Sequence, residues 1–171
     1  MEQDPKIGGP FVATPPEDSQ TGASEPPWRT SSSCLVESHS GPFRILLAED
    51  DDDMRCIVAD SLRYDGYDAV EIADGEVFLE IAARLEAGAD GGSIDLIVSD
   101  IRMPTCDGLE VLSALRDARC HIPVILMTAF GDEATRRQAA RLSAVLFDKP
   151  FDLDDLQTAV KNLLPRDSVG R

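Results

Sequence analysis

Short apolar segments that end abruptly in polar residues are the feature of this sequence that most limits its fold. Residues 43–48, 94–99, 122–127 and 144–147 form four such segments, and residues 67–72 also have the composition of a strand. Continuous apolar runs of this length are typical of strands buried on both faces of a parallel sheet. The sequence therefore predicts five strands inside a covered sheet.

The stretches between these strands show the helical spacing of apolar residues. In the first of them, one predicted helical face carries Met54, Ile57, Val58, Ser61 and Leu62. Further helices are predicted near residues 75–85, 109–115, 132–140 and 152–163. Strands that alternate with helices predict an α/β fold, here a doubly wound, five-stranded parallel sheet flanked by five helices.

The polar residues at the strand ends are expected to meet at one edge of this sheet. Glu49 and Asp50 follow the first strand. Asp100, Thr128 and Lys149 follow the third, fourth and fifth strands. In a doubly wound sheet, ligands bind outside the carboxyl ends of the strands. Carboxylates, a hydroxyl and an ammonium group should therefore line one site.

These residue types favour phosphoryl transfer assisted by a metal ion. Converging carboxylates repel one another unless a cation joins them, and a hard divalent ion such as Mg²⁺ prefers oxygen ligands. Lys149 would add positive charge, and Thr128 would donate to an anionic oxygen. A carboxylate can act as the nucleophile, and Asp100 is the natural candidate because it stands alone at the centre of the sheet.

The same residues give the chain, from about 43 to 165, a resemblance to the receiver domain of bacterial two-component response regulators. The resemblance rests on an ordered series of motifs. They are Glu49-Asp50 after Ile-Leu-Leu-Ala, Asp100 in Asp-Ile-Arg-Met-Pro, Asp107-Gly108-Leu109, Met127-Thr128-Ala129 and Asp148-Lys149-Pro150-Phe151. Each motif alone is weak, but their common order and their places at strand ends make the resemblance specific.

The resemblance implies a role for each residue of the site. Asp100 would accept a phosphoryl group from a phosphohistidine on a sensor histidine kinase or a histidine phosphotransfer protein. Mg²⁺ would be bound by Asp50, Asp100 and the backbone carbonyl of Arg102, with Glu49 assisting through water. Thr128 and Lys149 would hold phosphoryl oxygens after transfer. The Lys149–Pro150 peptide bond is expected to be cis, as is common in this family.

A receiver domain is a phosphoacceptor and not an enzyme, apart from catalysing its own phosphorylation and dephosphorylation. It would signal through protein–protein contacts. Where the family usually has an aromatic residue that couples phosphorylation to output, this chain has Leu146, so an aromatic switch is not expected. Arg102 and Phe130 would crowd the approach of water and slow self-dephosphorylation. The loop through residues 88–92 is about six residues longer than usual, which surface loops tolerate.

The composition of the chain predicts the limits of its domain and the classes of partner that it can bind. Residues 1–41 are rich in Pro, Ser and Thr and are predicted to be a disordered tail, residues 42–166 the receiver domain, and 167–171 a short C-terminal tail. A net charge of −16 argues against direct DNA binding and against anionic membranes. The acidic N-terminus does not resemble a signal peptide, and scattered cysteines fit a reducing cytoplasm.

Other functions stay open. A phosphatase of the haloacid-dehalogenase type also uses Asp, Thr, Lys and Mg²⁺, but its nucleophile lies in an Asp-x-Asp motif after the first strand, where this chain has Glu49-Asp50. A receiver fold that acts as an interaction module without phosphorylation is a second alternative. Because no output domain is visible, we expect a downstream protein target, or else that the chain is part of a longer regulator.

Overall fold

The computed structural model describes residues 41–86 and 94–164. The predicted N-terminal tail (apart from Gly41), the lengthened loop at 88–92 and the C-terminal tail lie outside these residues. What the sequence indicates about those segments therefore stays a prediction.

A five-stranded parallel sheet forms the centre of the domain, with strand order β2-β1-β3-β6-β7. The strands are β1 (Arg44–Ala48), β2 (Asp68–Ile72), β3 (Leu96–Asp100), β6 (Val124–Thr128) and β7 (Ala144–Asp148). The helices are α1 (Asp52–Tyr64), α2 (Gly75–Glu86), α3 (Gly108–Asp117), α4 (Glu133–Arg141) and α5 (Leu153–Leu163). The predicted doubly wound fold is confirmed. Because the chain reverses its winding direction between β1 and β3, their carboxyl ends border the crevice where such sheets bind ligands.

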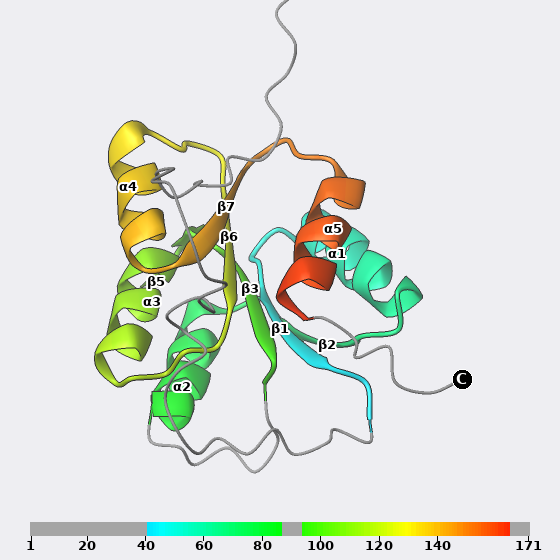
Figure 1. The fold of residues 1–171 in the computed structure, drawn as a ribbon, viewed down its shortest axis with the longest axis horizontal. Coiled ribbons are helices and arrows are strands. Elements are labelled where there is room, and N and C mark those ends of the chain that lie inside the picture. The colour runs from blue at the N-terminus through cyan, green and yellow to red at the C-terminus, as the bar shows by residue number, and fades with distance from the viewer. Residues whose placement is uncertain (1–40, 87–93, 165–171) are drawn as a thin grey trace, which may run out of the picture.

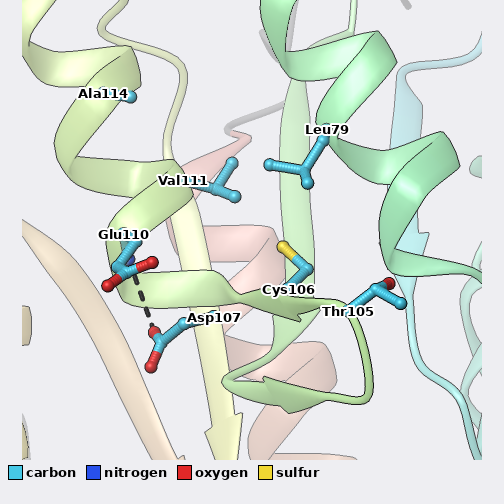
Figure 2. A pocket seen from close by; sticks show the side chains of 7 residues that line it. All are labelled: Leu79, Thr105, Cys106, Asp107, Glu110, Val111 and Ala114. Atoms are coloured by element: carbon cyan, nitrogen blue, oxygen red, sulfur yellow. Dashed lines mark hydrogen bonds between the residues drawn. The ribbon is translucent and has the colours of Figure 1, made fainter.

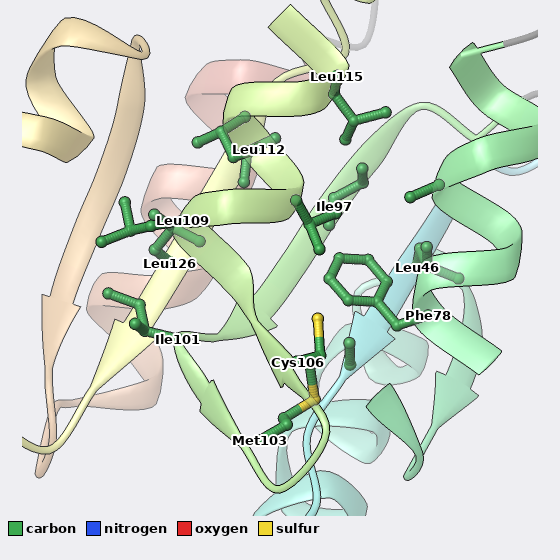
Figure 3. Close-up of a cluster of buried hydrophobic side chains, with 14 of the residues drawn as sticks. Leu46, Phe78, Ile97, Ile101, Met103, Cys106, Leu109, Leu112, Leu115 and Leu126 are labelled. Atoms are coloured by element: carbon green, nitrogen blue, oxygen red, sulfur yellow. The ribbon is translucent and has the colours of Figure 1, made fainter. Parts of the chain in front are cut away.

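Helices cover both faces of the sheet. In Figure 1, α1 and α5 lie on one face, and α2, α3 and α4 lie on the other. Successive strand residues point to opposite faces, so Leu46 joins the core under α2 and α3 while Leu47 joins the core under α1 and α5. Figure 3 shows the first of these cores, where Ile97 of β3 lies between Phe78 of α2 and Leu112 of α3.

The predicted face of the first helix is partly wrong. Val58 and Leu62 are buried as expected, but Ile57 is 52% exposed, and Ala59 is buried instead. A helix turns by about 100° per residue, so a buried face made of Val58, Ala59 and Leu62 leaves Ile57 turned toward solvent. The centre of the buried stripe lies one position later than the apolar residues alone indicate.

A small hairpin follows β3 where the sequence indicated only a loop broken by Pro104. It consists of β4 (Arg102–Met103) and β5 (Cys106–Asp107), which pair in an antiparallel register. Met103 and Cys106 are both buried beneath it. Cys106 is therefore part of the core. None of the helices among residues 41–86 and 94–164 has the length and apolar character needed to cross a bilayer.

Candidate functional site

The carboxylates of Glu49, Asp50 and Asp100 come together at the carboxyl ends of β1 and β3. The two strands are neighbours, and Ala48 is in register with Ser99, so the residues that follow lie side by side. One carboxylate oxygen from each of the acids lies within 4.8 Å of the others. Glu49 and Asp100 are buried, whereas Asp50 is exposed. The cluster is open to solvent on the Asp50 side.

Lys149 lies against two of these acids. Its Nζ is 2.7 Å from Oε2 of Glu49 and 3.2 Å from Oδ1 of Asp100, and its side chain is 18% exposed. The backbone N–H of Lys149 donates to the carbonyl of Thr128 at 2.7 Å, which ties the end of β7 to the end of β6. The Lys149–Pro150 peptide bond is cis, as predicted.

Thr128 ends β6, the strand next to β3, and its side chain is buried. Its Oγ1 accepts a hydrogen bond of 3.1 Å from the N–H of Phe130. A hydroxyl that accepts one hydrogen bond can still donate its own proton. The Phe130 side chain is 73% exposed, beside the site rather than in the core. Thr128 is therefore held by the start of the segment that leads into α4.

The chain after Asp100 is held close to the sheet. The N–H of Ile101 donates to the carbonyl of Met127 at 2.9 Å, and the N–H of Gly108 donates to the carbonyl of Ile101 at 2.8 Å. A side chain at Gly108 would bring its Cβ to 2.7 Å from the carbonyl oxygen of Asp100, so this close approach requires glycine. Arg102 begins β4 with an exposed side chain. A metal-binding role for its carbonyl stays a prediction.

Burial and charge act against each other in the cluster. Burial raises the pKa of Glu49, although the hydrogen bond and positive charge of Lys149 oppose this shift. Burial likewise raises the pKa of Asp100, against the charge of Lys149 and with added repulsion from Asp50. Burial alone would lower the pKa of Lys149, but its hydrogen bond with Glu49 and the charge of Asp100 outweigh burial and raise it.

The donor set fits a hard divalent cation. Lys149 offsets only part of the negative charge of the carboxylates, and their oxygen atoms are close enough to share one ion. Mg²⁺ is bound in proteins through one or two carboxylates and keeps several of its waters. The exposed Asp50 leaves room for such waters.

Residues 45–161 match the family model described as the response regulator receiver domain. The chain belongs to this family. Receiver domains are signalling domains that interact with histidine kinases and phosphotransfer proteins, and phosphorylation on an aspartate is typical of them.

This receiver domain is similar to several characterised proteins. Sporulation initiation phosphotransferase F of Bacillus subtilis is 31% identical over 123 residues, covering 71% of this chain and 94% of that protein. Regulatory protein AtoC of Escherichia coli is 33% identical over 131 residues, but these cover 75% of this chain and only 26% of AtoC. The response regulator TrrA of Thermotoga maritima, solved in complex with Mg(2+)-BeF, is 28% identical with a TM-score of 0.59, covering 71% of this chain and 99% of that one.

A cavity elsewhere in this receiver domain has no part in the acidic cluster. It measures about 240 Å³ and lies between α2 and α3. Figure 2 shows Leu79 and Val111 facing one another across it, with the Cys106 thiol at its base and Glu110 and Asp107 at one side. Burial raises the pKa of the Cys106 thiol, so the thiolate is disfavoured there.

Two polar contacts of the site are not apparent from the motifs. The hydroxyl of Ser99 donates to the carbonyl of Asp100 at 2.8 Å. Arg55, in the first turn of α1, donates to the carbonyl of Glu49 at 2.9 Å. A signal for Arg55 does exist in the sequence, since a cation in the first turn of a helix opposes the helix dipole. An arginine at this position needs a compensating interaction, and here the compensation is its hydrogen bond to the carbonyl of Glu49 at the end of β1.

Proposed function

We propose that Asp100 accepts a phosphoryl group from a phosphohistidine on a sensor histidine kinase or a histidine phosphotransfer protein. The observation that supports this most is the cluster of Glu49, Asp50 and Asp100 with Lys149 against it. An Asp100 oxygen attacks phosphorus, the P–N bond to imidazole breaks, and the imidazole leaves with a proton. The product is an acyl phosphate on Asp100.

The other residues of the site would position the phosphoryl group and neutralise its negative charge. Asp50, Asp100 and the carbonyl of Arg102 would hold Mg²⁺, with Glu49 acting through a metal-bound water. The ion would supply positive charge against the oxygens of the phosphoryl group. The acids that would hold Mg²⁺ surround Asp100, and Lys149 contacts its carboxylate, so the incoming anion would meet the positive charge of both.

After transfer, Lys149 and Thr128 would hold phosphoryl oxygens. Lys149 already contacts Asp100 at 3.2 Å, so a small shift of its ammonium group would reach a phosphoryl oxygen two bonds beyond the carboxylate oxygen. The Thr128 hydroxyl would donate to a second oxygen, since a hydrogen bond to an anion is stronger than one between neutral groups. Such a movement would weaken the present contact from the N–H of Phe130.

Loss of the phosphoryl group would be slow and self-catalysed. Arg102 and Phe130 both have exposed side chains and follow Asp100 and Thr128 by two residues. A large cation and an aromatic ring at these positions would limit the approach of a water molecule to the acyl phosphate. The domain would then keep its signal long enough to find a partner.

The output would pass to another protein rather than to DNA, because a net charge of −16 repels the phosphate backbone. The proposed setting is the cytoplasm, since phosphohistidine is made from ATP. We also propose residues 42–166 as the receiver domain, flanked by tails at 1–41 and 167–171. The family model, which matches residues 45–161, supports these limits.

Incubation of the full chain with acetyl phosphate and Mg²⁺, followed by intact-mass measurement, tests the acceptor. The wild type should gain one phosphoryl group, and Asp100→Asn should gain none. Asp53→Asn is the matched control, because Asp53 is an exposed acid in the first turn of α1 and is not one of the clustered acids. An unmodified wild type would favour an interaction module that works without phosphorylation. Release of p-nitrophenol from its phosphate ester would instead favour the dehalogenase-type phosphatase.

Thermal unfolding with and without Mg²⁺ tests the metal site. An ion that joins repelling carboxylates and binds only the folded chain should raise the Tm. Asp50→Ala should lose most of this rise, while Asp53→Ala should keep it. If Asp50→Ala kept the full rise, the ion would bind elsewhere.

A further inference from the structure

Arg55 joins the acid pair to the rest of the fold. Its side chain is only 14% exposed, and its Nη1 donates to the backbone carbonyl of Glu49 at 2.9 Å. That carbonyl belongs to the peptide group between Glu49 and Asp50. A hydrogen bond at this point fixes the plane of the peptide, and with it the direction in which both side chains leave the backbone.

The guanidinium is itself held by two acids. Its Nη2 pairs with Asp52 in the first turn of α1, and its Nε lies 3.6 Å from Oε2 of Glu71 in β2. Arg63 contacts the other oxygen of the same carboxylate, since its Nη2 donates to Oε1 of Glu71 at 2.7 Å. Arg55 therefore connects the end of β1, the start of α1 and β2. The rigid planar fork of arginine suits three acceptors in one plane, and the single ammonium of lysine does not.

We propose that Arg55 is a positioning residue that sets the Glu49–Asp50 peptide so that both carboxylates face Asp100 before any ion arrives. This inference rests on the proposed function, which supplies the Mg²⁺ ion, and adds what holds the acid pair in place. Lys149 joins Glu49 to Asp100, but Asp50 is exposed and repelled by its acidic neighbours, so it would turn away in a loose loop. Arg55 holds the acid pair together through the backbone without neutralising either carboxylate by direct contact.

A purely electrostatic role for Arg55 predicts the opposite result. If only its charge mattered, removing a cation near the site would tighten Mg²⁺ binding, because the local potential would become more negative. If Arg55 positions the peptide, removing it should weaken Mg²⁺ binding. Changes to residues that orient metal ligands typically reduce affinity by about 10- to 100-fold. The sign of the change therefore separates the two roles.

Calorimetric titration of the full chain with Mg²⁺ should be done on the wild type, Arg55→Gln, Arg55→Lys and Arg63→Gln. Arg63→Gln is the matched control, since Arg63 shares Glu71 but touches neither acid of the pair. We expect Mg²⁺ to bind about tenfold more weakly to both Arg55 variants and nearly normally to the control. Tighter binding to Arg55→Gln, or wild-type binding to Arg55→Lys, would overturn the inference.

Two further measurements complete the test. Amide hydrogen exchange of residues 49–52 in Mg²⁺-free protein should be faster in both Arg55 variants and unchanged in Arg63→Gln. Unchanged exchange in the Arg55 variants would contradict the inference, whether or not the protein binds Mg²⁺. Failure of the wild type to bind Mg²⁺ would count only against the proposed function. The Arg55→Lys variant should need more Mg²⁺ for phosphorylation by acetyl phosphate. At saturating Mg²⁺ it should be phosphorylated at the wild-type rate.

Discussion

Two helices border the same site and are held in different ways. Helix α1 buries Val58, Ala59 and Leu62 against the sheet, and Arg55 ties its first turn to β1 and β2. Helix α4 buries Ala139 as its only buried residue and is otherwise polar apart from alanines. Its tether to the end of β7 is the ion pair between Arg136 and Asp148, both partly exposed.

The α1 side of the site is therefore fixed, and the α4 side is free to move. Metal ligands must be in place before a reaction, and they lie beside the well-packed α1. Thr128 must respond to a new phosphoryl group, and the segment from Thr128 to α4 has little apolar contact to hold it. Regions with few buried contacts open at the lowest free-energy cost. We therefore expect phosphorylation to alter residues 130–140 and leave α1 unchanged.

The largest effect that tests this contrast is on global stability. Leu62→Ala removes a buried side chain and should lower the free energy of unfolding by about 2–5 kcal/mol. Ala139→Gly on α4 removes one methyl group and should cost about 1 kcal/mol, mainly through helix propensity. Urea unfolding of both variants measures the difference. Equal losses would show that α4 is anchored as firmly as α1.

Amide hydrogen exchange with and without beryllofluoride tests the movement itself. Protection at residues 130–140 should change severalfold, with no change in α1. Leu146 is 7% exposed and has no ring to swing, so Leu146→Ala should lower stability and leave the exchange response in place. Changes confined to α1 and α5 would instead place the output surface on the opposite face of the sheet.

The sequence predicted the fold well because both of its signals are strong and local. Apolar runs of strand length mark the sheet, and polar residues without a spacer mark the strand ends. The rim of Glu49, Asp50, Asp100 and Lys149 follows from strand order alone, and the structure brings these residues together. Asp51 caps the first helix by accepting from the N–H of Met54 at 2.8 Å, as an acid directly before a helix can do.

Features that depend on tertiary packing could not be predicted in this way. Ile57 looked buried because it is apolar, but its exposure depends on the exact rotation of α1, which neighbouring side chains decide. The β4–β5 hairpin is too short for a periodic pattern, and Met103 and Cys106 hold it to the core. The contacts of Arg55 and the pairing of Arg136 with Asp148 join residues far apart in sequence or on different elements.

A smaller effect is expected from breaking the tether of α4. Arg136→Ala should cost less than about 1 kcal/mol of global stability, because ion pairs this open to solvent contribute little. Exchange at α4 should nevertheless become faster, since Ala139 is the one buried residue of this helix. Arg137→Ala is the control, as Arg137 pairs with the exposed Glu133 of the same helix at 3.8 Å. Identical exchange in both variants would mean that the Asp148 contact does not restrain α4.

The smallest effect concerns the cap of α4 and its dependence on pH. Asp132 accepts from the N–H of Thr135 at 2.7 Å, and this hydrogen bond, helped by the charge of Arg102, lowers the pKa of Asp132. A carboxylate whose pKa is lowered by folding stabilises the helix above its unfolded pKa, and this contribution is lost as pH falls through the folded pKa.

Asp132→Asn keeps an acceptor at the cap but carries no charge. At neutral pH the wild type should therefore protect the Thr135 amide slightly better than this variant. The difference should vanish as the solution is acidified below the folded pKa of Asp132, and NMR-detected exchange of that amide measures it. The effect is expected to be visible because α4 depends on so few contacts. A difference that persisted in acid would mean that the amide side chain of the variant fails as a cap for steric reasons, and that the charge of Asp132 is not what protects the first turn of α4.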